Sequence, residues 1–222
     1  MPGREVEGGV LVSTGTGGGV FLTFEGIDGS GKSTQARRLA EALRAQGREV
    51  VLTREPGGAP GAEEIRALLV QGAPGRWSAE TELLLFNAAR RDHLERTIAP
   101  ALARGVVVIC DRFADSTRVY QGLRGAALRA EADRLHATFV GLEPVRSFFL
   151  DMAPEVAAAR AVRPGAAEDR FEAMGLGFQT RLAEGFRALA AEFPGRVRLV
   201  AADRPEAEVA ADVLALAMEV VA

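Results

Sequence analysis

Short apolar runs alternate with amphipathic stretches along most of the chain. The apolar runs predict five strands, over 19–25, 49–53, 105–110, 146–150 and 197–201. Between them, apolar residues recur every three or four positions, as on one face of a helix. This spacing predicts a helix ending near 46 and a helix beginning near 154, and further helices over 61–71, 79–104, 114–121, 126–140, 170–192 and 205–220.

The order of these elements indicates one α/β domain. The run 105–110 is apolar on both faces, as in a parallel strand covered on both sides. Alternating strands and helices predict a parallel sheet between two helical layers, with ligands beyond the carboxyl ends of the strands. We therefore expect a single domain over 18–222. The glycine-rich segment 14–19 indicates that residues 1–17 form a flexible leader.

Composition excludes several classes of function. The 222 residues carry a formal net charge of −3, which argues against a general nucleic-acid binder because such proteins are usually basic. One Cys excludes a disulfide framework and favours a reducing compartment. One Cys and two scattered His leave no His/Cys zinc site. No apolar run approaches the roughly 20 residues of a membrane span. We expect a cytoplasmic protein that binds neither nucleic acid nor membrane.

Residues 26–33 read Gly-Ile-Asp-Gly-Ser-Gly-Lys-Ser and follow directly on the first predicted strand. This is the P-loop pattern, in which backbone N–H groups of a glycine-rich turn surround phosphate oxygens. Lys32 is expected to reach the β- and γ-phosphates, and the Ser33 hydroxyl to bind Mg²⁺. The pattern predicts a site for ATP and Mg²⁺ formed by Gly26, Ile27, Asp28, Gly29, Ser30, Gly31, Lys32, Ser33 and Thr34.

Two further features narrow the class of P-loop protein. Lys32 is the only lysine in a chain with 26 arginines, as expected where a compact ammonium is needed rather than a planar guanidinium. The third predicted strand is followed by Asp111, whose carboxylate we expect to hold Mg²⁺ directly or through water. A GTPase normally carries an N-K-x-D sequence, which a chain with its only lysine in the P-loop cannot contain.

Several arginines stand where they could neutralise phosphate charge, which is a main source of catalysis in phosphoryl transfer. A single arginine is most often a solvated surface charge. We therefore select only arginines that lie beside other motifs. The candidates lie at element ends expected to face the P-loop, or they flank or lie within the aperiodic stretch 162–169: Arg54, Arg90, Arg112, Arg160, Arg163 and Arg170.

Four stretches of the chain carry distinctive sequences. They are Glu25-Gly-Ile-Asp-Gly-Ser-Gly-Lys-Ser-Thr34, Thr53-Arg-Glu-Pro-Gly-Gly58, Leu84-Leu-Phe-Asn-Ala-Ala-Arg90 and Asp111-Arg-Phe-Ala-Asp-Ser-Thr-Arg-Val-Tyr-Gln-Gly122. Together, and in this order, they resemble the bacterial thymidylate kinase family over about 19–210. The resemblance implies a three-layer α/β/α P-loop kinase fold with a five-stranded parallel sheet and a short lid at about 160–171. It also implies ATP-dependent phosphorylation of dTMP to dTDP, a step of dTTP biosynthesis.

The resemblance assigns residues to the phosphate and the sugar of dTMP. Asp28 would bind the 3′-hydroxyl, while Arg54 and Arg112 would hold the phosphate in line with the γ-phosphate of ATP. Tyr120 would fill the space of a ribose 2′-hydroxyl and so favour deoxyribose. It is the only tyrosine in a chain with 11 phenylalanines, which indicates that its hydroxyl is used.

The resemblance also assigns residues to the base. Phe86 would stack on thymine, and Arg90, one helical turn further and so on the same face, would donate to a base carbonyl. Thr117 and Gln121 would complete the contacts with the base edge. Ser116 lies in the same turn and is a further candidate.

The family also has a basic catalytic residue whose position varies among its members. Family members take it either from the P-loop or from the lid, and this P-loop offers Gly29 and Ser30 and no arginine. We therefore expect a lid arginine to contact the transferred phosphoryl group. Arg163 is the first choice, with Arg160 and Arg170 left open, and Arg160 would stack on adenine.

Some positions depart from the family or stand outside its motifs. Phe113 replaces the usual Tyr, and Val119 replaces a usual Ala, so Val119 is expected to crowd the sugar pocket. His93 and His136 are expected on helix surfaces.

Similar kinases are homodimers, so we expect a homodimer by resemblance.

Two alternatives remain open. Another small-molecule P-loop kinase could act on a deoxynucleoside or a different monophosphate, although Arg54 and Tyr120 argue against both. A nucleotide-dependent switch protein would hydrolyse ATP slowly and independently of dTMP. The chain carries no switch signature.

Overall fold

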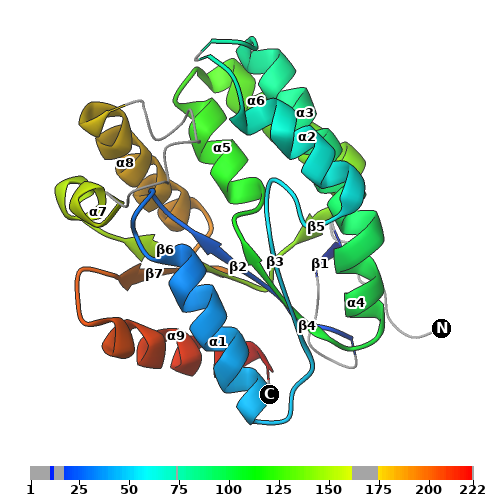
Figure 1. Cartoon of the computed structure of the whole chain (residues 1–222), viewed down its shortest axis with the longest axis vertical. Coiled ribbons are helices and arrows are strands. Elements are labelled where there is room, and N and C mark those ends of the chain that lie inside the picture. The colour runs from blue at the N-terminus through cyan, green and yellow to red at the C-terminus, as the bar shows by residue number, and fades with distance from the viewer. Residues whose placement is uncertain (1–10, 13–17, 74, 162–174, 222) are drawn as a thin grey trace.

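The five predicted strands form one parallel sheet (Figure 1). The computed structural model describes residues 11–12, 18–73, 75–161 and 175–221. The strands of this sheet stand in the order β3-β4-β2-β6-β7. Their bounds are β2 Phe21–Glu25, β3 Val50–Arg54, β4 Val107–Asp111, β6 Arg146–Asp151 and β7 Val197–Ala201.

Helices cover both faces of the sheet, which confirms the predicted three-layer fold. Helices α1 and α9 lie on one face, and α4, α5 and α8 lie on the other, while α2, α3 and α6 extend beyond the strand ends. Two π-helical segments, η1 and η2, continue α3 and α6. The bounds are α1 Lys32–Ala45, α2 Pro60–Val70, α3 Ala79–His93, η1 Leu94–Ile98, α4 Ala99–Ala103, α5 Ala114–Gly122, α6 Ala126–Leu135, η2 His136–Val140, α7 Pro154–Ala161, α8 Leu176–Glu192 and α9 Glu206–Val221.

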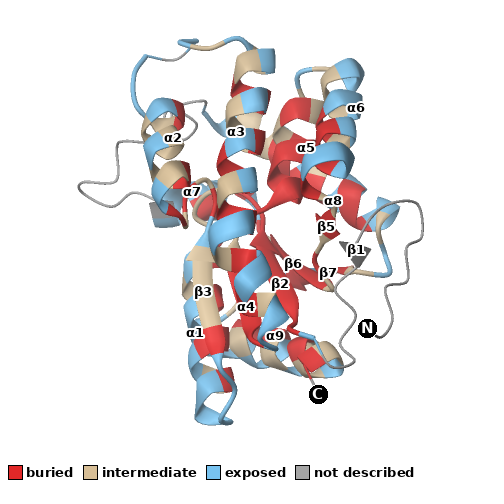
Figure 2. Cartoon of the chain, turned by 90° about the vertical axis from the view of Figure 1, so that its right-hand side faces the viewer, coloured by how far each residue is buried: buried red, intermediate tan, exposed pale blue. Residues whose placement is uncertain are grey.

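Burial on both faces explains why the strands read as continuous apolar runs. Leu22 and Phe24 of β2 pack in the core cluster that includes α1, and Phe21 packs in the cluster that includes α4. Every residue of β2 is buried, and Figure 2 shows the central strands as buried between the helices. A strand with water on one face would instead alternate apolar and polar residues.

Some features differ from the sequence predictions. A second, two-stranded parallel sheet pairs β1 (Leu11–Val12) with β5 (Leu142–Glu143), and neither strand was expected. The rest of the predicted leader, and the predicted lid from residue 162, lie outside the described residues. Among the described helices, none combines the length and apolar character that a membrane span requires.

The carboxyl ends of the parallel strands meet at one edge of the sheet. In β2, Phe24 pairs with Asp111 of β4, and Asp111 pairs in turn with Arg54 of β3. Glu25, the last residue of β2, leads into the P-loop. Three of the four motif segments, those that follow β2, β3 and β4, therefore converge at this edge.

Candidate active site

The P-loop backbone is shaped by glycines whose positions leave no room for a side chain. Gly26 and Gly29 both have positive φ, 135° and 79°. A Cβ on Gly26 would lie 2.8 Å from the Leu150 carbonyl oxygen, and one on Gly29 would lie 2.1 Å from that of Ala157. Ala157 belongs to α7, so the helix that leads to the predicted lid packs directly against the loop.

Lys32 begins α1 and is buried beneath the loop. Its Nζ donates to the Ile27 carbonyl oxygen at 2.7 Å and lies 3.8 Å from Asp28 Oδ1. Burial, and after it the Arg112 guanidinium, lower the pKa of Lys32 to about 8. A desolvated ammonium under a glycine turn is suited to bind phosphate oxygens.

Ser33 and Asp111 form the candidate magnesium site. The Ser33 hydroxyl donates to Asp111 Oδ2. Asp111 Oδ1 is buried and has no hydrogen-bond partner among the described residues. Mg²⁺ prefers hard oxygen ligands and is usually held by one or two protein groups together with phosphates and water. These two side chains fit that requirement. In the described residues, no group of three or more His, Cys, Asp or Glu is placed to hold a metal ion.

Beside the P-loop lies a cleft whose empty space, with its open mouth included, is about 530 Å³. Apart from Arg54 and Gln121, the cleft is lined by every residue predicted to bind dTMP: Asp28, Phe86, Arg90, Arg112, Ser116, Thr117 and Tyr120. They come from the P-loop, α3, the β4–α5 turn and α5. The fold thus brings together side chains that are distant in the sequence.

Arg112 connects the cleft to the P-loop. It is the only non-glycine residue with positive φ (69°) in the described part of the chain. Its guanidinium binds Asp28 and donates to Ser116 Oγ at 3.1 Å and to the Gly26 carbonyl oxygen at 3.2 Å. Burial alone would raise the pKa of Asp28, but Arg112 and Lys32 outweigh it and hold that pKa below its usual range. Asp28 is therefore a carboxylate, able to accept from a hydroxyl.

The opposite side of the cleft carries an arginine and an aromatic ring from α3. Arg90 is buried, and its Nη2 donates to Thr117 Oγ1 at 2.9 Å. Phe86 lies one turn earlier on the same helix and also lines the cleft. A flat ring and a fixed donor side by side can bind a planar base, the ring by stacking and the arginine by hydrogen bonding.

Tyr120 and Gln121 occupy different positions. The Tyr120 ring lines the cleft and contacts Phe178 of α8 edge to face, with ring centroids 5.9 Å apart. Gln121 is buried outside the cleft lining, and its Oε1 has no hydrogen-bond partner in the described part of the structure. Its predicted contact with the base would require it to turn toward the cleft.

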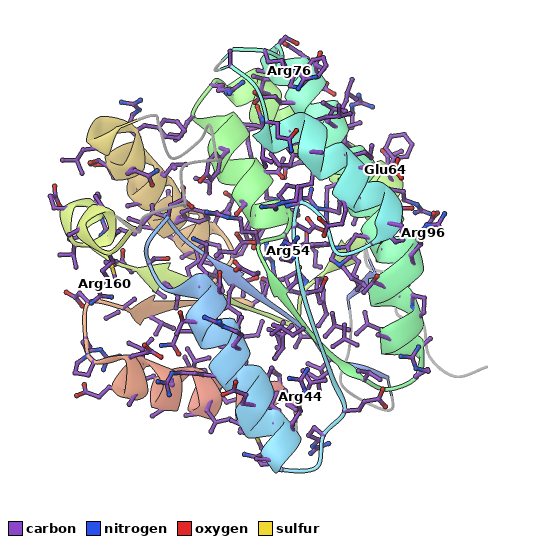
Figure 3. All side chains as sticks on the ribbon, in the orientation of Figure 1. Arg44, Arg54, Glu64, Arg76, Arg96 and Arg160 are labelled. Atoms are coloured by element: carbon purple, nitrogen blue, oxygen red, sulfur yellow. The ribbon has the colours of Figure 1, made fainter. Side chains whose placement is uncertain are left out.

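The remaining predicted cations lie toward solvent. Arg54 is exposed at the end of β3 and donates to Glu63 of α2 at 3.1 Å. Arg160, also exposed, donates from α7 to the Ala202 carbonyl oxygen at 3.1 Å. In Figure 3 Arg54 lies toward the centre of the view and Arg160 lies on the left. Arg163 and Arg170 lie outside the described residues.

Glu25 was not predicted as a site residue. It is buried at the end of β2, where it accepts from the Phe113 N–H at 2.8 Å and from Ser116 Oγ. Burial, reinforced by the nearby Asp115 carboxylate, raises the pKa of Glu25 to about 8. It ties the P-loop strand to the turn that carries Arg112. The feature of the sequence that could have pointed to Glu25 is a carboxylate at the end of a mostly apolar strand.

The prediction of surface histidines is wrong. His93 is completely buried between Thr53 and Glu55, and His136 is buried 3.1 Å from a Glu143 oxygen. In both cases the carboxylate lies outside the helical run that carries the histidine. The helical pattern alone therefore cannot reveal that the imidazole has a buried partner.

Comparison with known proteins places these features in a family. The family model described as thymidylate kinase matches residues 24–213. The chain is 63% identical over 197 residues to a thymidylate kinase of Dinoroseobacter shibae, covering 89% of this chain and 95% of that protein. It is 62% identical over 198 residues to a thymidylate kinase of Ruegeria pomeroyi, covering 89% and 94%.

A solved structure agrees with the sequence comparison. The crystal structure of thymidylate kinase from Ehrlichia chaffeensis superimposes with a TM-score of 0.71 at 36% sequence identity. The match covers 90% of this chain and 99% of that one.

Proposed function

The chain belongs to the thymidylate kinase family, and we propose that its phosphorylation of dTMP to dTDP takes place in the cleft beside the P-loop, with ATP as donor. One observation carries this assignment of the site. Side chains from four separate motifs line a single cleft that opens next to Lys32, so an acceptor in the cleft would face a phosphate on the loop.

The cleft is proposed to hold dTMP by its base and sugar. Phe86 stacks on thymine, and Arg90 donates to a base carbonyl from a position fixed by Thr117. Asp28, kept ionised by its cationic neighbours, accepts from the 3′-hydroxyl. Tyr120 occupies the side of the sugar on which a ribose 2′-hydroxyl would lie.

The transfer step requires positioning and charge neutralisation more than proton transfer. An oxygen of the dTMP phosphate attacks the γ-phosphorus of ATP, the bond to the β–γ bridging oxygen breaks, and ADP leaves. The attacking oxygen is already anionic, so no general base is needed. Arg112 and Arg54 align the acceptor phosphate, and Lys32 neutralises charge on the donor.

Two further groups complete the proposed mechanism. Ser33 and Asp111 would hold Mg²⁺, which supplies charge neutralisation at the β- and γ-phosphate oxygens when bound with ATP. The P-loop provides no arginine, so we assign the contact with the transferred phosphoryl group to a lid arginine, Arg163 first. Arg160 donates from α7 to the Ala202 carbonyl oxygen, and the resemblance to the family assigns it to adenine.

A coupled assay of ADP release over a panel of acceptors tests this proposal. dTMP should give the highest kcat/KM, and faster turnover of dUMP, dCMP or thymidine would overturn the choice of acceptor. Arg90→Ala should raise the KM for dTMP at least tenfold. Arg96→Ala is the matched control, because Arg96 is an exposed arginine further along the same helical run and pairs with Asp92 at the protein surface.

We also propose a homodimer in the cytoplasm. Leu84 of α3 and Phe139 of η2 are unusually exposed for apolar residues, at 58% and 51%. Arg91 links these two elements by donating to the Phe139 carbonyl oxygen at 2.7 Å. Two exposed apolar side chains on neighbouring elements support an interface there, because large exposed apolar surface often marks protein interfaces. Light scattering after size exclusion should give twice the monomer mass, and Leu84→Glu should reduce it.

A further inference from the structure

His93 has both ring nitrogens engaged although its side chain is 0% exposed. Nδ1 lies 3.1 Å from Glu55 Oε1, and Nε2 lies 2.8 Å from Thr53 Oγ1. A carboxylate can only accept, so Nδ1 carries a hydrogen and donates to Glu55. In the neutral imidazole Nε2 is then the acceptor, and the Thr53 hydroxyl donates to it.

The other oxygen of Glu55 holds Arg90. Glu55 Oε2 accepts from Arg90 Nε at 2.7 Å, and the two side chains are only 5% and 3% exposed. Arg90 is further fixed by Thr117 and lies 5.1 Å above the Phe113 ring. Its guanidinium plane is therefore set by contacts made before any ligand is bound.

The chain of contacts runs from a residue outside the cleft to one inside it. Glu55 and Arg90 line the cleft, whereas His93 does not. We propose that His93 is a positioning residue for the acceptor base: it orients Glu55, and through Glu55 it holds Arg90 in the geometry that binds the base. This inference rests on the proposed function, because it concerns the same acceptor site.

The surrounding loop is built around the imidazole. A Cβ on Gly58 would lie 2.5 Å from His93 Nε2 and 2.4 Å from Thr53 Oγ1. Gly58 also has a positive φ of 84°, and its carbonyl oxygen accepts from Thr97 Oγ1 at 2.8 Å. The loop between Thr53 and Gly58, which includes Glu55, is thus closed over the ring with no spare volume.

Two replacements of His93 separate its two contacts. In His93→Asn the side-chain amide nitrogen can stand near the position of Nδ1 and so donate to Glu55. In His93→Gln the side chain is longer than that of asparagine and places its amide near the position of Nε2. There it can hydrogen-bond to Thr53, and Glu55 Oε1 loses the hydrogen bond from Nδ1. A third variant, Thr53→Val, removes only the hydroxyl.

Calorimetric titration of dTMP without ATP, and steady-state kinetics with both substrates, measure the effect. Losing a hydrogen bond to a charged group is expected to weaken dTMP binding by roughly tenfold or more in His93→Gln. His93→Asn and Thr53→Val should remain within about threefold of wild type. In all three, kcat and the KM for ATP should change little, because donor groups are untouched.

Three outcomes would overturn the inference. Equal dTMP affinity in His93→Gln and wild type would show that losing the His93–Glu55 hydrogen bond has no effect on the cleft. Equal weakening in His93→Asn and His93→Gln would contradict the role of Nδ1. A fall in kcat and in thermal stability together with a rise in the KM for ATP would indicate a purely structural role.

The proposed function is tested separately by the wild-type protein. If wild type fails to bind dTMP, the acceptor assignment fails before any variant is measured. If His93→Gln does not fold, Thr53→Val with Thr53→Ser as its conservative partner still tests the relay. Thr53→Val should then weaken dTMP binding more than Thr53→Ser does, while staying within threefold of wild type. The reverse order would refute the path from His93 through Glu55 to Arg90.

Discussion

Replacing Gly185 with alanine should destabilise the protein, although alanine is the better helix residue. Gly185 lies inside α8, and a Cβ there would lie 2.8 Å from Val119 Cγ1 of α5. Val119 is buried, and a branched side chain in a helix has one strongly preferred rotamer, so its methyl group cannot easily turn aside.

Val119 packs on α8 and does not line the cleft, so the prediction that it crowds the sugar pocket is wrong.

The sizes of the two opposing effects decide the sign. A glycine-to-alanine change inside a helix gains about 1 kcal/mol, whereas overpacking a core by one methyl group costs about 1–3 kcal/mol. The expected net loss is about 1 kcal/mol in the free energy of unfolding. In a Val119→Ala background the overlap disappears, so the same change should gain about 1 kcal/mol. The coupling between the sites is then about 2 kcal/mol, within the range for residues in contact.

Urea unfolding followed by circular dichroism on wild type, both single variants and the double variant gives the four free energies. Gly177→Ala is the matched control in the same helix, because nothing lies within 4 Å of its Cβ. It should not lower stability. A Gly185→Ala protein more stable than wild type, or strict additivity in the cycle, would refute the close contact between α5 and α8.

Three further predictions concern single residues of the site. Lys32→Arg should lower kcat by about 10²-fold or more despite keeping the charge, because a planar fork cannot occupy the slot beneath the loop; near-normal kcat in steady-state kinetics would contradict this. Tyr120→Phe should reduce the preference for dTMP over its ribonucleotide, measured as a ratio of kcat/KM, and an unchanged ratio would exclude the role of the hydroxyl. Glu25 has a folded-state pKa of about 8, above its ordinary value of 4.5, so its protonation favours the folded state. That contribution is complete below about pH 4.5 and is lost as the pH rises to about 8, by at most about 1.4 kcal/mol per pH unit. Glu25→Gln should flatten the pH dependence of the urea midpoint in this window, and an unchanged slope would argue against it.

Hydrophobic pattern predicts the sheet because parallel strands buried on both faces leave little ambiguity. Val107–Asp111 and Phe21–Glu25 are apolar along nearly their whole length, and no amphipathic helix reads that way. The two-stranded sheet of Leu11–Val12 and Leu142–Glu143 carries no such signal. Strands of two residues are too short for any periodicity to appear.

The motifs predict most of the cleft because each is a local run whose side chains the backbone turns toward the same edge. Glu25 and His93 escape prediction for another reason. Their roles depend on partners across the fold, the Phe113 amide for one and Glu55 for the other. A polar residue in a helix or at a strand end gives no indication of what it will meet.

Burial separates the two arginines that are proposed to hold opposite ends of dTMP. Arg54 and Glu63 are 55% and 43% exposed, and an ion pair of that kind contributes about 0–1 kcal/mol. Arg90 and Glu55 are 3% and 5% exposed, and removing one partner of such a pair costs about 3–5 kcal/mol. Arg54 can therefore leave Glu63 for a phosphate at little cost, whereas Arg90 must act where it stands. On the proposed function, the base end of the cleft would therefore be rigid and would select by fit, and the phosphate end would adjust as the acceptor is aligned with the donor.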